Sequence, residues 1–194
     1  MFLRELRRRF PGSKVMEQFV VRLSTPHDLS DITRIYGHYV LHGSATFEVD
    51  PPGRDEMAQR RSGILALGLP FLTAVTQGAQ QGAQQGAVAG YAYASVYRPR
   101  PAYRFTVEDS IYVDPQHAGC GCGHVLLAAL IEHCERGPWR QMVAVIGDSG
   151  NTASIRLHQR FGFRHAGTLY SVGFKFNRWV DTVLMQRPLG SGTC

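Results

Sequence analysis

A glycine-dense turn between an apolar strand and an apolar helix constrains this chain more than any other feature of its sequence. The strand predicted over 105–113 is ended by Asp114-Pro115, and glycine then occupies every second position from 119 to 123. Glycines let a backbone approach a ligand closely, and the unpaired N–H groups of a helix N-terminus attract anions. The unit therefore predicts a pyrophosphate site, although by itself a tight strand-to-helix connection would explain the pattern equally well.

Spacing argues against two common phosphate motifs and against a metal site. No Gly-Lys-Ser/Thr follows the turn, so it is not a P-loop, and Gly-x-Gly-x-Gly does not match the fingerprint of dinucleotide-binding folds. Cys120 and Cys122 are one residue apart, whereas zinc-binding cysteines normally leave two or more between them. We therefore expect no metal, even with His117 and His124 nearby.

The order of apolar segments and turn signals predicts a mixed α and β domain. Strands are expected at 20–23, 71–76, 88–96, 105–113, 142–146, 166–174 and 179–187. Helices are expected between the cap at 24–25 and a loop at 42–53, at 54–67, between the glycine turn and Gly137-Pro138, and at 151–161. This order favours an α+β fold, a three-layer α/β/α arrangement around a mixed, mostly antiparallel sheet. The apolar strand at 142–146 is expected to be buried on both faces.

The formal net charge of +6 is concentrated near the N-terminus. Residues 1–14 hold five basic residues and one acidic residue, which gives +4 and leaves +2 for the rest. The rest has no basic stripe with interleaved aromatic residues and no window of 18 uncharged apolar residues, so neither a nucleic-acid partner nor a membrane span is expected. We predict a disordered basic extension at 1–16, one domain at 17–188 and a tail at 189–194.

Two further features bear on location and loops. The four cysteines form no disulfide framework, which favours the cytoplasm as the compartment. Residues 77–87 repeat Gln-Gly-Ala between two strands of a predicted hairpin. Such a segment cannot pack a core and is predicted to be a mobile loop.

The glycine turn gains specificity from the segments around it. The turn, a leucine-rich helix, an apolar strand and Asn151-x-x-Ser154-x-x-x-His158-x-x-x-Gly162-Phe163 together resemble the GNAT family of acetyl-CoA-dependent N-acetyltransferases. Thr46-Phe47-Glu48, residues 106–113, and Val172-Gly-Phe-Lys175 with Trp179 and Asp181 look like its phosphinothricin and methionine-sulfoximine branch. The resemblance covers about 20–188. One position departs from it, because Ala118 stands where the family usually has Arg or Gln.

The resemblance implies an acetyl-CoA site. Its predicted residues are Ile111, Tyr112, Val113, Gly119, Cys120, Gly121, Cys122, Gly123, His124, Asn151 and Ser154. Two of them have a simpler explanation. Asn151 stands at the start of a helix and suits an N-cap, and Tyr112 suits packing.

The resemblance also implies direct transfer of an acetyl group to an amine. Glu108 is the predicted general base, with ion pairing to Arg98 or Arg104 as the alternative. Asp109 points to the opposite face of the strand and is not assigned a role. His158 stands where many relatives have a tyrosine that protonates the departing sulfur, and histidine can do the same near neutral pH.

Residues for an amino-acid-like acceptor are predicted upstream of Glu108 and near both ends of the domain. They are Phe47, Arg98, Arg100, Tyr103 and Lys175. Guanidinium groups suit a carboxylate or phosphinate. The alternatives are an exposed cationic loop for the arginines, a core position for Phe47, and an ion pair with Asp181 for Lys175.

The predicted function is acetylation of the α-amine of a small amino-acid analogue such as phosphinothricin, methionine sulfoximine or methionine sulfone. A detoxifying role and a homodimer follow from the resemblance. The alternatives are a polyamine or peptide N-terminus as acceptor, and a non-catalytic acyl-CoA sensor. The arginines ahead of Glu108 argue against the polyamine, whose pocket should be acidic.

Overall fold

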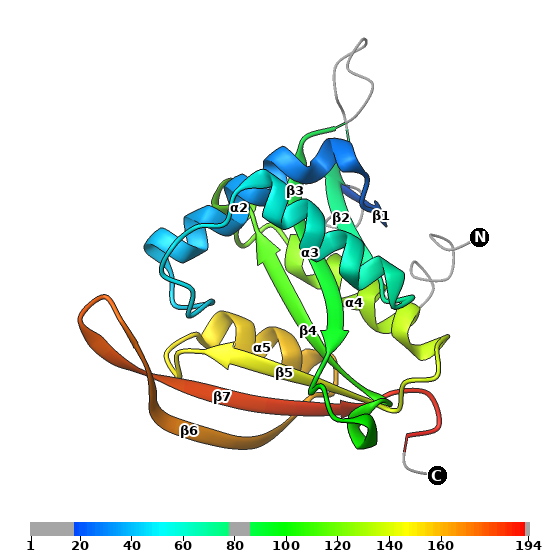
Figure 1. Cartoon of the computed structure of the whole chain (residues 1–194), viewed down its shortest axis with the longest axis vertical. Coiled ribbons are helices and arrows are strands. Elements are labelled where there is room, and N and C mark those ends of the chain that lie inside the picture. The colour runs from blue at the N-terminus through cyan, green and yellow to red at the C-terminus, as the bar shows by residue number, and fades with distance from the viewer. Residues whose placement is uncertain (1–17, 78–85, 193–194) are drawn as a thin grey trace.

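Residues 18–77 and 86–192 are described by the computed structural model of this chain (Figure 1). The basic extension predicted at 1–16 and the central part of the Gln-Gly-Ala repeat, residues 78–85, lie outside the described residues. Within the described part, no helix has the length and apolar character that crossing a bilayer requires.

A seven-stranded sheet forms the middle layer, with the strand order β1-β2-β3-β4-β5-β7-β6. Of the six strand pairs in the described part of the chain, β4 with β5 is parallel and the other five are antiparallel, which confirms the predicted mixed, mostly antiparallel sheet. The strands are β1 (Phe19–Leu23), β2 (Phe71–Thr76), β3 (Val88–Val96), β4 (Thr106–Val113), β5 (Gln141–Gly147), β6 (Arg164–Lys175) and β7 (Arg178–Pro188).

Helices cover both faces of the sheet, which confirms the three layers (Figure 1). α2 (Leu29–His42) and α3 (Arg54–Ala66) lie on one face; α4 (Cys122–Glu135) and α5 (Thr152–Arg160) lie on the other. Among the described residues, three short 3-10 helices connect elements: η2 (Pro26–Asp28), η3 (Pro101–Tyr103) and η4 (Pro115–His117). η2 occupies the start of the first predicted helix, with Thr25 as its N-cap and Pro26 in its first turn.

The core is divided between the two faces because side chains alternate along each strand. Leu126, Leu130 and Met142 are fully buried in the cluster on the α4 side. Ile32, Ile35 and Tyr91 are fully buried in the cluster on the α2 side. Both clusters include residues of β3 and β4, so these central strands are packed on both faces.

The structure differs from two of the sequence-based expectations, at β5 and at the start of the predicted tail. β5 was expected to be buried on both faces, but Val145 is 38% exposed while Ala144 and Ile146 are buried, so one of its faces is open. Leu189 begins the predicted tail, yet it is fully buried and its N–H donates to the Arg140 carbonyl. The core therefore extends one residue into that segment.

Lys175 holds the loop that follows α2. Its ammonium donates to the carbonyls of Gly43 and Thr46, both at 2.8 Å, and to that of Tyr39 at 3.3 Å. The side chain is 4% exposed. Burial lowers the pKa of Lys175, and the charge of Glu48 opposes that shift. The end of β6 is thereby fastened to the end of α2, and residues 43–46 are held in place.

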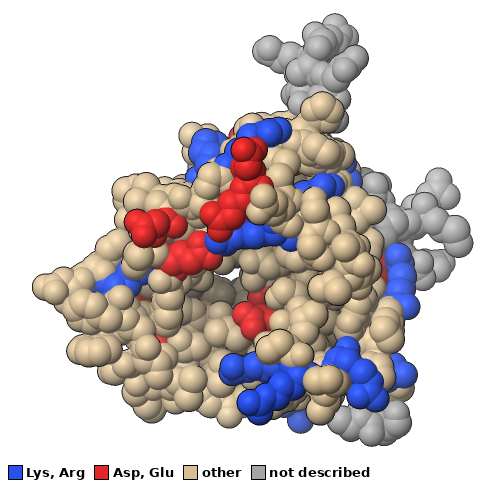
Figure 2. All heavy atoms as spheres, in the orientation of Figure 1, with Lys and Arg blue, Asp and Glu red and all other residues tan. Residues whose placement is uncertain are grey.

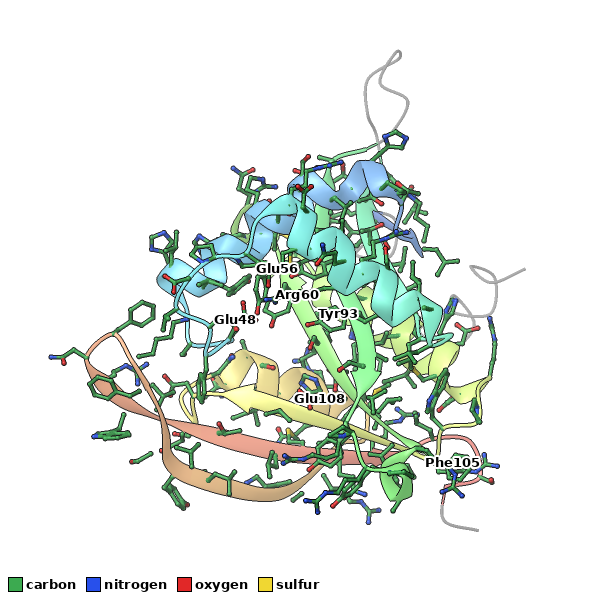
Figure 3. The ribbon with its side chains drawn as sticks, viewed as in Figure 1. Glu48, Glu56, Arg60, Tyr93, Phe105 and Glu108 are labelled. Carbon is green, nitrogen blue, oxygen red and sulfur yellow. The ribbon has the colours of Figure 1, made fainter. Side chains whose placement is uncertain are left out.

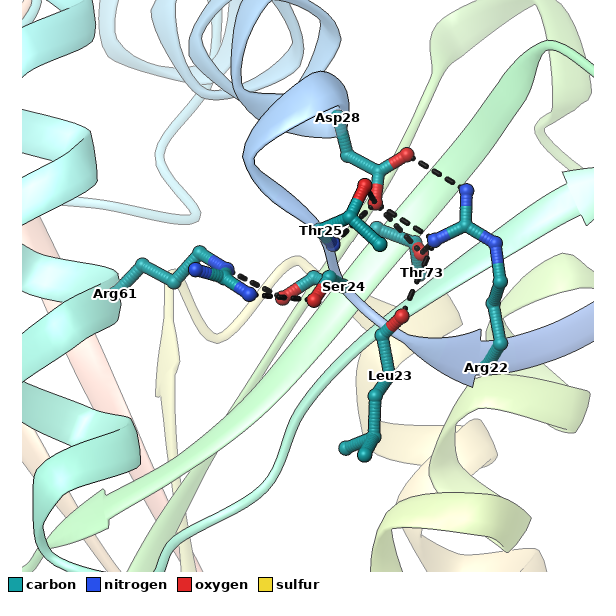
Figure 4. Close-up of polar contacts among 7 residues, drawn as sticks. All are labelled: Arg22, Leu23, Ser24, Thr25, Asp28, Arg61 and Thr73. Carbon is teal, nitrogen blue, oxygen red and sulfur yellow. Dashed lines mark hydrogen bonds and ion pairs between the residues drawn. The ribbon is translucent and has the colours of Figure 1, made fainter. Parts of the chain in front are cut away.

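A polar network joins β1 to η2 (Figure 4). The Arg22 guanidinium donates to both carboxylate oxygens of Asp28 at 2.7 and 2.8 Å, and it also contacts Thr73. The Thr25 N–H donates to the same carboxylate at 2.6 Å. Burial by itself would raise the pKa of Asp28, but these hydrogen bonds and the Arg22 charge outweigh it, so the pKa lies below its usual value.

We predict that Lys175→Met lowers the free energy of unfolding by about 2 kcal/mol, because buried carbonyls lose their donor. Amide hydrogen exchange at 43–46 should become faster, while exchange in α4 should be unchanged. Urea denaturation and exchange mass spectrometry measure the two effects. Lys175→Arg retains donors and should lie between the wild type and Lys175→Met; equal exchange at 43–46 in all three proteins would contradict the role of Lys175.

We also predict that Asp28→Asn lowers the free energy of unfolding at pH 7 by about 1–3 kcal/mol. The folded-state pKa of Asp28 is lowered, so its contribution is present above its unfolded-state pKa and is lost as the pH falls through the folded-state pKa. The difference between wild type and variant should therefore shrink in acid. Asp31→Asn removes an exposed carboxylate nearby and should change stability by less than about 1 kcal/mol.

Candidate active site

The site begins where two neighbouring strands separate. β4 and β5 pair only from Thr106 with Gln141 to Asp109 with Ala144, and both strands then continue without pairing to each other. A cavity of about 400 Å³ lies at this separation. It is lined by the far halves of both strands, by the glycine turn and by one side of α5. The backbone edges of both strands are therefore available to a ligand that enters between them.

The glycine turn presents unpaired donors to this cavity. Gly119 has φ +76° and Gly121, the N-cap of α4, has φ +85°, and glycine adopts both values without strain. Among the described residues, no partner accepts from the N–H groups of Gly119, Gly121, Cys122 and Gly123. These donors, at the positive end of a 14-residue helix, suit a pyrophosphate.

Polar contacts fix the turn to α2. Asp114 accepts a hydrogen bond from the Gln116 N–H at 2.9 Å, and its other carboxylate oxygen pairs with Arg34 at 2.7 Å. The Tyr39 hydroxyl donates to the Val113 carbonyl at 2.6 Å. The end of β4 and the turn after it are thus attached to the helix on the opposite side of the sheet from α4.

Ten of the eleven predicted acetyl-CoA residues line the cavity. Cys120 does not; it is exposed. Cys122 is buried, burial raises the pKa of its thiol to about 12, and its sulfur lies 3.5 Å from the Ala89 carbonyl. The Asn151 side chain accepts from the Ser154 N–H at 3.2 Å, so Asn151 is an N-cap as well as a lining residue. Tyr112 also has two roles, since its ring packs against Tyr36 at 5.1 Å.

Glu108 lies on the face of β4 that points toward α2 and α3. It faces Ser95 across the β3–β4 pair and Val143 across the β4–β5 pair, immediately before the strands separate. Burial and the neighbouring charge of Asp109 raise the pKa of Glu108 from its usual value near 4.5 to about 7, and the charge of Arg98 opposes that shift. Glu108 can therefore gain or lose a proton near neutral pH.

His158 and Asp109 form a buried pair on the opposite face of β4. The Nε2 atom of His158 lies 2.9 Å from the Asp109 carboxylate, and its Nδ1 atom lies 2.8 Å from the Ser154 carbonyl. Burial by itself would lower the pKa of His158, but the hydrogen bond and charge of Asp109 and the Ser154 carbonyl outweigh it and raise the pKa. The alternation of side chains along the strand correctly predicts that Asp109 lies on this face, but it does not predict the pairing with His158.

The face of the sheet with Glu108 opens into a recess. Figure 2 shows this hollow between the helices and the lower strands, with acidic atoms on both of its borders. Glu48, Arg60, Tyr93 and Glu108 lie around it and come from a loop, α3, β3 and β4 (Figure 3). Arg60 pairs with Glu48 at 2.7 Å and with Glu56, and it lies over the Tyr36 ring.

The predicted acceptor residues fall in two groups, one in the segment before β4 and one at the loop after α2 and the end of β6. The guanidinium of Arg98 lies over the Tyr97 ring, and its charge acts on Glu108. Arg100 is the exposed N-cap of η3, and Tyr103 is 42% exposed with its ring edge on Tyr97. These three residues lie in one segment before β4.

Phe47 lies in the loop after α2, and Lys175, the last residue of β6, holds that loop. Phe47 is 40% exposed, and a Cβ atom at Gly173 would lie only 2.4 Å from its ring. Lys175 already donates to three carbonyls, so an acceptor would have to displace one of them. Asp181 does not pair with Lys175; it accepts from Ser149 and from the Ser171 N–H.

Sequence reasoning did not find Asp109, Tyr39 or the Glu48–Arg60 pair as parts of the site. Each depends on a partner far along the chain: Asp109 on residue 158, and Tyr39 on residue 113. The Glu48–Arg60 separation of twelve residues crosses a loop and carries no periodic signal. Within the described residues, no group of three or more His, Cys, Asp or Glu side chains could hold a metal ion.

Comparison with known proteins agrees with this geometry. Residues 46–163 match the acetyltransferase (GNAT) family. The chain is 54% identical over 172 residues to the phosphinothricin N-acetyltransferase of Alcaligenes faecalis, covering 89% of this chain and 83% of that protein. It is 38% identical over 172 residues to the L-methionine sulfoximine/L-methionine sulfone acetyltransferase of Salmonella typhimurium, covering 87% and 94%.

The fold agrees as well. A crystal structure of a GNAT superfamily phosphinothricin acetyltransferase from Sinorhizobium meliloti in complex with AcCoA matches with a TM-score of 0.84 and 46% identity, covering 91% of each chain. Since the family match spans more than half of the chain and the alignments cover most of each protein, this chain belongs to the acetyltransferase (GNAT) family, in its phosphinothricin and methionine sulfoximine branch, and is an N-acetyltransferase with acetyl-CoA as co-substrate.

Proposed function

We propose that this enzyme acetylates the α-amine of a small amino-acid analogue, with Glu108 as the general base. The observation that carries the proposal is the position of Glu108: it is half-buried, it faces the recess, and it stands next to the point where β4 and β5 separate. Relatives that share 54% and 38% of the sequence are named for phosphinothricin and for methionine sulfoximine and methionine sulfone.

Two parts of the site act in the proposed reaction: Glu108 on β4 and the glycine turn that follows β4. Acetyl-CoA supplies a thioester carbonyl, and an amine can attack it only after losing its ammonium proton. Glu108 accepts that proton, directly or through a water, because its pKa of about 7 lets it be deprotonated at neutral pH and still basic enough to act. The unpaired N–H groups of the glycine turn hold the pyrophosphate and thereby fix the position of the thioester.

An amino-acid-like acceptor also presents a carboxylate. Arg98 and Arg100 belong to the segment just before β4, and the charge of Arg98 acts on Glu108, so this segment can hold an anionic group near the base. A polyamine has no anionic group for these cations to bind. An acyl-CoA sensor would not require a carboxylate whose pKa lies near neutrality at the strand separation.

We also propose that the enzyme acts as a homodimer of domains spanning 17–188 and detoxifies such analogues in the cytoplasm. Exposed apolar side chains on β6 and β7 support an interface with a second copy: Leu169, Tyr170, Val172, Phe174 and Trp179. Cys120, Cys122 and Cys134 are free thiols, as expected in a reducing compartment.

We predict that a panel assay with acetyl-CoA shows turnover of phosphinothricin, methionine sulfoximine or methionine sulfone, with polyamines and peptide N-termini much slower. Arg98→Gln and Arg100→Gln should raise KM for these acceptors while leaving KM for acetyl-CoA close to wild type. Binding of acetyl-CoA without acetylation of any amine would favour the sensor instead.

We predict that kcat/KM rises with pH through an apparent pKa of about 7, the value for Glu108. The sign follows from the base: Glu108 works when deprotonated, so activity is lost as the pH falls below its raised pKa. Glu108→Gln should lower kcat by about 100-fold or more and remove this limb. Wild-type turnover in Glu108→Gln would show that another group takes the proton.

A further inference from the structure

The imidazole of His158 has both nitrogens engaged, and this restricts its protonation state. A carbonyl oxygen can only accept a hydrogen bond, so the Nδ1 atom, 2.8 Å from the Ser154 carbonyl, carries a hydrogen. The Nε2 atom lies 2.9 Å from Asp109. The pair is therefore either an imidazolium with a carboxylate or a neutral imidazole with a carboxylic acid, and in both cases one extra proton is held between the two side chains.

The imidazolium with a carboxylate is favoured because an imidazole is more basic than a carboxylate, although burial by itself disfavours both charges. The side chains of His158 and Asp109 are only 5% and 2% exposed, so water does not weaken their attraction. The other carboxylate oxygen of Asp109, Oδ1, is buried with no hydrogen-bond partner in the described structure. A buried carboxylate keeps its negative charge only if a cation lies beside it. For Asp109 that cation is the His158 imidazolium.

Ser154 extends this pair to the cavity. Its hydroxyl oxygen lies 3.4 Å from His158 Nδ1, and Ser154 is half-buried among the residues that line the cavity. Asp109, His158 and Ser154 thus form a continuous chain of polar contacts, from a carboxylate at the last paired position of β4 to a hydroxyl at the cavity wall.

We propose that Asp109, His158 and Ser154 form a proton relay in which Ser154 is the catalytic residue that protonates the departing sulfur, His158 supplies the proton, and Asp109 is a positioning residue that keeps His158 as the imidazolium. This proposal rests on the proposed function and specifies its leaving-group step. It replaces direct proton donation by His158, because the two ring nitrogens point at Asp109 and at the Ser154 carbonyl, and the Ser154 hydroxyl is the cavity-lining group next to Nδ1.

The proton count balances along the relay. As the carbon–sulfur bond of the thioester breaks, the Ser154 O–H bond breaks and a sulfur–hydrogen bond forms. The Nδ1 proton of His158 leaves its hydrogen bond with the Ser154 carbonyl and moves to the Ser154 hydroxyl oxygen. The imidazole is left neutral with its hydrogen on Nε2, still donating to the Asp109 carboxylate. The nitrogen loses two protons in all: Glu108 takes the ammonium proton before the attack and passes it to solvent, and it then takes the second N–H proton as the intermediate collapses. Solvent returns a proton to His158 after the products leave.

Several titratable groups surround the relay. On β4, Glu108 is adjacent to Asp109, and the two carboxylates act on each other across the strand. On α4, the buried Cys134 thiol is coupled to Asp109, and His124 lines the same cavity. Arg160 on α5 also lines the cavity, and the Phe163 ring packs edge-on against His158. Among these side chains, Asp109 is the one that hydrogen-bonds the His158 ring.

The first experiment measures the protonation state without any turnover. In ¹⁵N-histidine NMR of the cofactor-free protein, His158, identified by its loss in His158→Gln, should show both nitrogens protonated at pH 7. In Asp109→Asn, His158 should be neutral at the same pH. Asp28→Asn removes another buried, arginine-paired carboxylate outside the cavity and should leave the His158 signals unchanged.

The second experiment tests the relay with the best acceptor of the panel. Ser154→Ala should lower kcat by about 100-fold, as expected for a lost general acid, while its Kd for coenzyme A stays near wild type. Ser154→Thr keeps the hydroxyl and should retain most of kcat. Asp109→Asn should shift the alkaline limb of the kcat profile to lower pH, and Asp28→Asn should leave that limb unchanged.

The outcomes separate this proposal from the proposed function. A neutral His158 at pH 7 in the wild-type protein, or full kcat in Ser154→Ala, would overturn the relay even if amino-acid analogues are acetylated. If the panel instead identifies a different amine, the proposed acceptor fails, but the NMR result and the Ser154 variants assayed with that amine still decide the relay.

Discussion

The separation of β4 from β5 after Asp109 and Ala144 is the constraint on which the active site depends. Parallel strands that stay paired would satisfy each other's backbone groups and leave no opening. Here the two strands diverge, because β4 is held by the Tyr39 hydroxyl and the glycine turn, while β5 stays paired along its length with β7. The backbone groups released by this divergence line the cavity for which we propose acetyl-CoA, and the N-terminus of α4 beyond β4 completes it.

Strand alternation then divides the chemistry between two faces. Glu108 and Asp109 are neighbours in sequence, yet Glu108 faces the recess that we propose for the amine and Asp109 faces α5. Their environments differ accordingly: Glu108 forms no ion pair within the described residues and feels the charge of Arg98 without contacting it, whereas Asp109 is paired directly with His158. A carboxylate without a close cation becomes a base near neutral pH, and a carboxylate with one stabilises an imidazolium. Two adjacent acidic residues can therefore serve opposite proton transfers.

The acceptor side is built by attachment of loops rather than by regular elements. The segment from Gly43 to Glu48 has neither helix nor strand, and it is held by Lys175 from β6, by Arg60 from α3 and by close packing of Phe47 on Gly173. Ser44 also approaches the backbone at Gly147 so closely that a Cβ atom there would lie 2.0 Å from its carbonyl oxygen. Apart from the Arg60–Glu48 pair, the contacts that shape the recess join residues more than a hundred positions apart.

The sequence by itself determined the elements and the cofactor turn. The strands at 71–76 and 88–96 have the predicted bounds, and the turn from Gly119 to Gly123 opens α4 as expected, because glycine spacing and apolar periodicity are local signals. Glu108 and His158 were found through a resemblance of motifs. Tertiary structure alone decided three other features. Asp109 pairs with His158, Lys175 donates to the carbonyls of the loop after α2, and one face of β5 is open. These features depend on which distant segments of the chain meet, and no local sequence pattern encodes that. Burial and hydrogen bonding between the segments then set the charge that each group carries.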